Sequence, residues 1–314
     1  MWTAISAGNR TQCVDRATVR RDTHGYRRFM TAKVLVGVLV LVGAAGLFTG
    51  CSGSRQIYRS APLEREIELN RKATTAFERG HYETALAGYR EALQISRAIE
   101  HVDGTAANLL DLAAAYRVVG DGEKAARAVD EILADGKHAF PPAQRAAAAY
   151  LRALLYADAN ALPDASRLAA QALALCRESA CGSAGRIVNL QARIAFLAGD
   201  RVSALGSALE ALRLNRKAKA DEETSNSLRI AADVRSLSGE LAKAEEDYAE
   251  ALALDKKLGL AAKIHLDLIR LGDVAAGQLR AEDARAYYQR ALDVSRGAAD
   301  ERGMTEAAER IRGL

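Results

Sequence analysis

Aromatic residues and proline are scarce in this chain of 314 residues: aromatics make up 5% of it, and there are 4 prolines. Sheets are usually rich in β-branched and aromatic residues, whereas alanine and leucine, which dominate here, favour helices. With 49% hydrophobic residues, the chain has enough apolar surface for a folded core. We therefore predict an all-α protein packed through small side chains.

Most of the chain also lacks an excess of positive charge. The formal net charge is +4, but residues 1–50 alone hold seven basic and two acidic residues. The remainder, 51–314, is nearly neutral, and the single tryptophan, Trp2, lies outside it. Because nucleic-acid binding needs a broad basic surface, we expect no nucleic-acid partner.

Patterns that usually carry catalysis or bind metal ions are missing. There is no Gly-rich phosphate loop, nucleophile elbow or HExxH motif. Beyond residue 51 the histidines are scattered, with no pair four residues apart: His81, His101, His138 and His265. We therefore expect no enzyme activity, no cofactor and no metal site.

A hydrophobic run long enough to cross a membrane is absent, but a shorter one lies near the N-terminus. The stretch VLVGVLVLVGAAGLF, residues 34–48, is uncharged and preceded by Lys33. A membrane span needs about 20 apolar residues, whereas the core of a signal peptide needs about 7–15. We predict that residues 1–50 are a signal peptide, with Met30 as an alternative start.

A lone cysteine, Cys51, follows this run in the stretch LFTGCSGSR. The pattern resembles the bacterial lipoprotein signal, in which the thiol is lipidated and the chain is cut just before it. That family usually has Leu three residues before the cysteine, where this chain has Phe48. The resemblance implies lipidation of Cys51, a polar tether over 51–66 and, from Ser52, an outer-membrane location facing the periplasm. The alternative is an ordinary buried cysteine after a signal anchor.

Internal repeats are the clearest signal in the rest of the chain. Six segments superimpose without gaps, from GHYETALAGYREAL to LRAEDARAYYQRAL, and their shared alanines are 40, 40, 39, 40 and 40 residues apart. These alanines are Ala85, Ala125, Ala165, Ala204, Ala244 and Ala284. A preceding helical stretch carries a small residue seven positions before each turn: Ala73, Ala113, Ala153, Ala192, Ala232 and Gly272. The unit is therefore helix A, a short turn and helix B.

These small residues, with Tyr89, Tyr248 and Tyr288 in helix B, stand at the offsets of the tetratricopeptide repeat (TPR), which the chain resembles. The period is 40 instead of the common 34, and the usual closing proline is absent. HEAT-like repeats have a similar length, but their signature is missing. The resemblance implies a right-handed α-solenoid of six helix-turn-helix repeats over 67–299, capped by a helix at 300–314.

Two cysteines, Cys176 and Cys181, lie where the third helix B ends. Five residues of continuous helix separate Cα atoms by at least about 7.5 Å, whereas a disulfide spans up to roughly 6.8 Å. A bond therefore requires the helix to break between them, and Gly182 and Ser183 favour a loop there. In an oxidising periplasm we predict a disulfide, with two free or semi-buried thiols as the alternative.

The TPR resemblance also implies that helix A residues line a concave groove that holds a peptide or a partner helix. Projecting the groove positions of the family gives these candidate partner-binding residues: Phe77, Tyr150, Arg186, Asn189, Arg193, Asn226 and Arg229. Arginine and asparagine can chelate a carboxylate, as in the carboxylate-clamp members of the family. Alternatively these are solvated helix faces, some of them paired with Asp233, Glu222 or Glu223.

Together these features indicate a lipid-anchored periplasmic scaffold or adaptor that binds a protein or peptide and supports envelope assembly or secretion. An alternative function is a receptor for a small acidic ligand or cell-wall fragment held by the Arg and Asn cluster. An enzyme such as a cell-wall lyase is disfavoured because a catalytic domain is missing.

Overall fold

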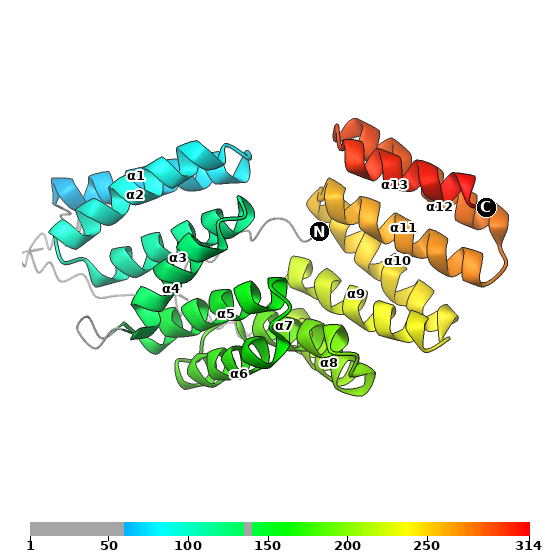
Figure 1. The fold of residues 1–314 in the computed structure, drawn as a ribbon, viewed down its shortest axis with the longest axis horizontal. Coiled ribbons are helices and arrows are strands. Elements are labelled where there is room, and N and C mark those ends of the chain that lie inside the picture. The colour runs from blue at the N-terminus through cyan, green and yellow to red at the C-terminus, as the bar shows by residue number, and fades with distance from the viewer. Residues whose placement is uncertain (1–59, 135–139) are drawn as a thin grey trace, which may run out of the picture. The chain divides into compact units, whose positions relative to one another are not determined.

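The computed structural model describes residues 60–134 and 140–314, which form thirteen α-helices and no strands (Figure 1). In chain order they are α1 (Ala61–Glu78), α2 (Tyr82–Ala98), α3 (Val102–Val118), α4 (Gly122–Ala134), α5 (Pro142–Asp158), α6 (Leu162–Glu178), α7 (Ala184–Leu197), α8 (Arg201–Ala218), α9 (Asp221–Leu237), α10 (Leu241–Leu258), α11 (Ala261–Gly277), α12 (Ala281–Gly297) and α13 (Glu301–Arg312). The predicted signal peptide, Met30 and Cys51 lie outside the described residues.

The helices form six A–B pairs, in which odd-numbered helices are A and even-numbered helices are B. Each helix packs on the next one along the chain, and α13 follows as one more helix of type A on α12. The prediction of an all-α solenoid of helix-turn-helix repeats is confirmed. The first helix begins at Ala61, inside the segment predicted as a tether, because Pro62 and Glu64 both suit the first turn of a helix.

A left-handed residue in each fully described turn marks the 40-residue period. Positive φ recurs every 19 or 20 residues, except between α4 and α5, where part of the turn lies outside the described residues. Between helices A and B these residues are Gly80, Gly120, Asn160, Gly199, Gly239 and Leu279; between helix B and the next helix A they are Glu100, Ala180, Lys219, Gly259 and Ala299. The N–H of the following residue donates to the carbonyl five residues back, which is the Schellman motif. Because both kinds of turn are alike, each helix with its turn takes about half of the repeat.

Small residues let helices A and B approach closely within each repeat. Ala85 and its five equivalents in helix B are fully buried. Tyr288 is buried beside Gly272, where an added Cβ would lie 2.2 Å from the Tyr288 ring. The tyrosines of helix B therefore fill the space that the small residues of helix A leave.

Helices of type A contact one another from repeat to repeat, whereas among the described residues helices of type B make no comparable contacts. The A–A contacts join α1 to α3, α3 to α5, α5 to α7, α7 to α9 and α11 to α13. Between α9 and α11 long polar side chains span the gap instead, with Arg229 bonded to Asp267 and Lys263 to Glu222. The A helices thus provide one surface shared by successive repeats.

The apolar core is interrupted near α9. One buried cluster runs from Ala73 to Ile194 and another from Ala232 to Ala307, with a small third cluster around Ile230. Buried polar residues occupy the region between them: Asn189, Asn215, Ser225, Ser227, Arg229, Asp255 and Asp267. We call this set the polar layer.

The described residues offer neither a candidate membrane span nor a candidate metal site. None of their helices is both long and apolar enough to cross a bilayer. They also hold no group of three or more His, Cys, Asp and Glu side chains arranged to bind a metal ion.

Candidate partner-binding surface

All seven predicted partner-binding residues lie on helices of type A: Phe77 on α1, Tyr150 on α5, Arg186, Asn189 and Arg193 on α7, and Asn226 and Arg229 on α9. Phe77, Tyr150, Arg186 and Arg193 are half-buried side chains, and Phe77 packs edge-on against Tyr82 with ring centroids 5.5 Å apart. We call the surface that carries these four residues and Arg117 the helix A face.

Three of the residues predicted to bind a partner's carboxylate contact a carboxylate of the chain itself, that of Glu223. The Asn189 Nδ2 donates to Glu223 Oε2 at 2.9 Å, and the Asn226 Nδ2 donates to the same oxygen at 3.2 Å. The Arg186 Nε lies 3.4 Å from Glu223 Oε1. The cluster thus has the chemistry to bind a carboxylate, and in this structure Glu223 supplies it.

Arg229 is one of three predicted groove residues that the structure buries, together with Asn189 and Asn226. The Arg229 side chain is 2% exposed, its Nε donates to Asp267 Oδ1 at 2.7 Å, and its Nη2 donates to Asp255. Asn226 Oδ1 accepts a further bond from its Nη1. Because α10 and α11 both supply a carboxylate, Arg229 is held inside the polar layer and does not reach an open surface.

Burial of Asp267 beside Arg229 and Asp255 changes the pH at which Asp267 loses its proton. Asp267 is fully buried, which raises its pKa from 3.8 to about 7, although Arg229 acts in the opposite direction. The neighbouring Asp255 raises the pKa of Asp267 further. Two carboxylates therefore share one guanidinium, and Asp267 retains its proton to nearly neutral pH.

Two arginines, Arg117 on α3 and Arg193 on α7, bind the same aspartate. Arg117 Nε donates to Asp158 Oδ2 at 2.6 Å, and Arg193 Nη2 donates to Asp158 Oδ1 at 3.4 Å. Asp158 is the last residue of α5, so one carboxylate joins three successive A helices. The structure thus places Arg193 beside the partner Asp158, which the sequence pattern did not indicate.

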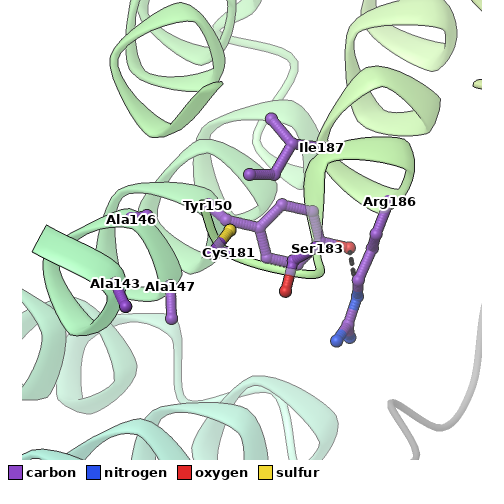
Figure 2. A pocket seen from close by; sticks show the side chains of 8 residues that line it. All are labelled: Ala143, Ala146, Ala147, Tyr150, Cys181, Ser183, Arg186 and Ile187. Carbon is purple, nitrogen blue, oxygen red and sulfur yellow. Dashed lines mark hydrogen bonds between the residues drawn. The ribbon is translucent and has the colours of Figure 1, made fainter. Parts of the chain in front are cut away.

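Between α5 and α7 lies a cavity of about 60 Å³, which we call the Tyr150 pocket (Figure 2). It is lined by Ala143, Ala146, Ala147, Tyr150, Cys181, Ser183, Arg186 and Ile187. Arg186 stacks on the Tyr150 ring at 4.9 Å, and its Nε donates to the Tyr150 hydroxyl at 3.2 Å.

A late helix start accounts for this cavity. The other A helices that follow a described left-handed residue begin two positions after it, as Val102 follows Glu100, whereas α7 begins four positions after Ala180. Helix α7 therefore begins two residues late, and Cys181 and Ser183, which precede it, line the pocket. Contacts between α5 and α7 are few, as they also are between α11 and α13.

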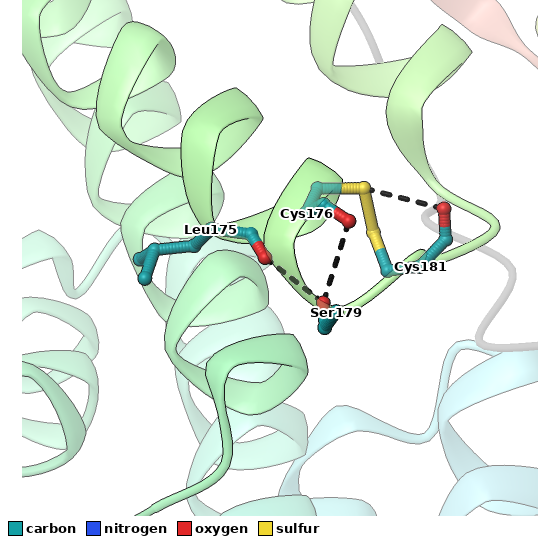
Figure 3. The surroundings of a disulfide bond; sticks show 4 residues. All are labelled: Leu175, Cys176, Ser179 and Cys181. Atoms are coloured by element: carbon teal, nitrogen blue, oxygen red, sulfur yellow. Dashed lines mark hydrogen bonds between the residues drawn. A yellow bond between two sulfur atoms is a disulfide. The ribbon is translucent and has the colours of Figure 1, made fainter.

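A disulfide between Cys176 and Cys181 closes the turn that precedes α7 (Figure 3). The helix breaks at Ala180, whose φ is 49°, and this brings the two Cα atoms to 4.9 Å. The Cys181 N–H donates to the Cys176 carbonyl in the Schellman motif, in which these two positions usually make an apolar contact. Here the covalent bond takes the place of that contact.

The sequence had suggested Glu223 as a partner of these residues, and the structure shows that pairing, whereas Asp255 and Asp267 were not foreseen. One signal was available for Asp255. It occupies the same place near the end of helix B as Ser96, Cys176, Asn215 and Ser295, all of which are buried. A polar residue repeated at one position of an apolar helix indicates a buried polar site.

Comparisons with known proteins agree with this architecture. A family model described as the MalT-like TPR region matches residues 146–310. A Rap protein in complex with competence and sporulation factor is 12% identical, with 81% of this chain and 76% of that chain covered and a TM-score of 0.59. PilF of Pseudomonas aeruginosa is 15% identical, with 79% and 98% covered and a TM-score of 0.53.

A third similar structure is a signal transduction ATPase of Pyrococcus horikoshii with a TPR sensor, at 18% identity and a TM-score of 0.62. The match covers 80% of this chain and 37% of that one. At these identities the likeness is one of fold. No curated protein sequence matches the chain.

Proposed function

The chain belongs to the MalT-like TPR family, and from this premise we propose that it is a scaffold or adaptor that binds a protein or peptide partner on its helix A face. Repeat proteins of this type generally act as non-catalytic scaffolds with extended binding surfaces. Binding is therefore the proposed role, without a catalytic step.

The observation that carries the proposal is the composition of the helix A face. Half-buried Phe77, Arg117, Tyr150, Arg186 and Arg193 come from four successive repeats. Tyrosine and arginine are enriched in protein interfaces, where they contribute much of the binding energy. Several of these side chains are held by Asp158 and Tyr150, so less rotamer freedom is lost when a partner binds.

Two similar structures support a binding role. The Rap protein is in complex with competence and sporulation factor, and the Pyrococcus ATPase has its TPR region as a sensor. The Tyr150 pocket, at about 60 Å³, is well below the roughly 300–1,000 Å³ of sites that enclose a small molecule. We therefore favour an extended partner over an enclosed cell-wall fragment.

We also propose that Cys51 is lipidated and holds the repeats on the periplasmic side of the outer membrane, where the partner acts in envelope assembly or secretion. The sequence pattern at Cys51 supports this, and the Cys176–Cys181 disulfide suits an oxidising compartment. Since α1 begins at Ala61, the intervening tether reaches roughly 33 Å if extended.

Partner capture from detergent-solubilised membranes tests the function. The variant Tyr150→Ala with Arg193→Ala should lose most of the captured partner. The matched control is Arg167→Ala with Arg213→Ala, because these arginines lie on helix B and each pairs with an acid three residues away. Equal capture by both variants and the native chain would refute binding on the helix A face.

Location has a separate test. Cys51→Ala should leave an unacylated precursor that is not cleaved before residue 51, as mass spectrometry can show. A mature N-terminus elsewhere in the native protein would contradict the proposed anchor.

A further inference from the structure

We propose that the Cys176–Cys181 disulfide is a redox switch of the helix A face. In the oxidised chain the cross-link keeps α7 at its late start and maintains the Tyr150 pocket. Reduction by a dithiol lets α7 begin at Gly182, which turns Ser183 away from the pocket. The effect on partner binding rests on the proposed function, whereas the change in α7 does not.

One backbone hydrogen bond distinguishes α7 from the equivalent A helices. In the four other fully described turns from helix B to helix A, the residue after the left-handed one accepts the first helical bond, as the His101 carbonyl accepts from the Thr105 N–H at 2.9 Å. The matching bond from Gly185 to Cys181 is not formed in this turn, which is also described in full. Instead the Cys181 carbonyl oxygen lies 3.3 Å from Cys176 Sγ (Figure 3). The cross-link thus occupies the carbonyl that would begin the helix.

Glycine by itself does not explain the late start. Gly182 holds the first position that α7 would gain, and glycine is a weak helix former. Yet Gly122 holds the matching position, two residues after the left-handed Gly120, and α4 begins there. The feature that sets the turn before α7 apart is the disulfide, because none of the other described turns contains a cysteine. Breaking the cross-link therefore removes the constraint on α7.

An earlier start of α7 changes the wall of the pocket, which Ser183 lines while it precedes the helix. The residues at the matching place, three after the left-handed one, are Asp103 on α3 and Glu222 on α9. Asp103 accepts a bond from Gln144 on α5, and Glu222 accepts one from Lys263 on α11. Each thus faces the next A helix along the chain. Once helical, Ser183 faces α9 instead of α5, and the pocket loses part of its wall.

The pocket gives a reductant access to one of the two sulfur atoms. Cys176 is 1% exposed, whereas Cys181 is half-buried and lines the pocket (Figure 2). A thiolate of the dithiol attacks Cys181 Sγ, the S–S bond breaks, and Cys176 leaves with the electron pair and takes up a proton. The second thiol then displaces Cys181 from the mixed disulfide. The two cysteines gain two electrons and two protons, and the dithiol becomes a disulfide.

Carbon-13 chemical shifts in the full chain in detergent measure the start of α7. After reduction with dithiothreitol, verified by alkylation and mass spectrometry, the Cα shift of Ser183 should move into the helical range. Exchange of the Gly185 amide should slow severalfold, because it gains the bond to Cys181. An unchanged Ser183 shift after complete reduction would overturn the proposal. Loss of the helical shift at Ile187 would also overturn it, since α7 would then shorten.

Two variants separate the disulfide from glycine. Cys176→Ser with Cys181→Ser should show the helical Ser183 shift without a reductant, and dithiothreitol should change it no further. Gly182→Ala keeps the disulfide and should keep the late start until it is reduced. An early start in oxidised Gly182→Ala would mean that glycine, and not the cross-link, holds α7. Because Gly182→Ala contains both cysteines, it gives the answer even if the serine variant fails to fold.

Partner capture measures the consequence for the helix A face. The reduced chain should capture severalfold less partner than the oxidised chain, because Tyr150 and Arg186 line the altered pocket. The variant Cys176→Ser with Cys181→Ser, used without a reductant, should show the same loss and excludes an effect of dithiothreitol on the partner. Equal capture by the oxidised and reduced chains would refute redox control of this face.

The switch and the proposed function fail separately. If Ser183 keeps its oxidised shift while Tyr150→Ala with Arg193→Ala loses the partner, the switch is wrong and binding on the helix A face stands. If Ser183 moves as expected but that double variant captures the partner as well as the native chain, the proposed function is wrong while the change in α7 stands.

Discussion

Single residues in the polar layer carry unbalanced charge. Arg229, Asp255 and Asp267 are all fully buried, and one guanidinium cannot neutralise two ionised carboxylates. Burying an unpaired charge is costly, so the native state keeps a proton on Asp267. The cluster thus makes stability depend on pH.

Stability should fall as pH rises through the pKa of Asp267. This pKa is about 7 in the folded chain against an ordinary value of 3.8, so the native state binds more protons between these values. The free energy of unfolding therefore decreases from about pH 4 to about pH 8. Urea unfolding at pH 5 and pH 8 measures this. Asp267→Asn should show a smaller loss, and an unchanged loss would contradict the assignment.

Removing the guanidinium should have a larger effect. Arg229→Met leaves two buried carboxylates without their cation and should reduce the free energy of unfolding by about 3–5 kcal/mol at pH 7. Arg167→Met, at an exposed arginine of α6, is the control and should cost less than about 1 kcal/mol. Urea unfolding compares them, and equal effects would mean that Arg229 is not buried as described.

At the scale of the elements, the turns between helices A and B have one exception. Four of the six turns between helices A and B place glycine in the left-handed position and one places asparagine, whereas the sixth has Leu279 at φ 61°. The Leu279 side chain is 93% exposed and so gains little from packing. A branched residue in this conformation costs about 1–2 kcal/mol, which glycine avoids.

Leu279→Gly should therefore stabilise the chain by about 0.5–1 kcal/mol, because the lost strain exceeds the extra backbone entropy of glycine. The reverse change at the equivalent position, Gly239→Leu, should destabilise by about 1 kcal/mol. Thermal unfolding of both variants tests the pair. Destabilisation by Leu279→Gly would indicate that this leucine has a contact that the structure does not show.

The close packing of helices A and B in the sixth repeat can be tested by a substitution at Gly272. An added methyl group would meet the Tyr288 ring at 2.2 Å, and Tyr288 donates to Asp273 on the same helix as Gly272. Gly272→Ala should therefore cost about 1–3 kcal/mol despite the better helix propensity of alanine. Gly206→Ala, on α8 with open space around it, should be neutral or stabilising. Calorimetry distinguishes the two.

For the whole molecule, periodicity made the fold predictable from sequence but left the pairing of charges undetermined. Ala85 and its equivalents identified helix B because small residues recur wherever two helices touch. Arg229 looked like a groove residue by position, yet its partners lie 26 and 38 residues further along the chain. Such partners depend on how neighbouring repeats rotate against each other, and a single repeat does not contain that information. The Tyr150 pocket likewise arises from the late start of α7, which breaks the period.

We expect the polar layer to divide the solenoid into two parts that unfold separately. Solenoid stability is the sum of repeat and neighbour-interface terms, and α9 lies between the two larger apolar clusters. We expect hydrogen exchange in low urea to show two protection levels that change near α9, with α10–α13 opening together. Arg229→Met should widen the difference, since it weakens the contact of α9 with α10 and α11. Uniform protection from α1 to α13 in that variant would mean that the polar layer couples the repeats as firmly as an apolar core.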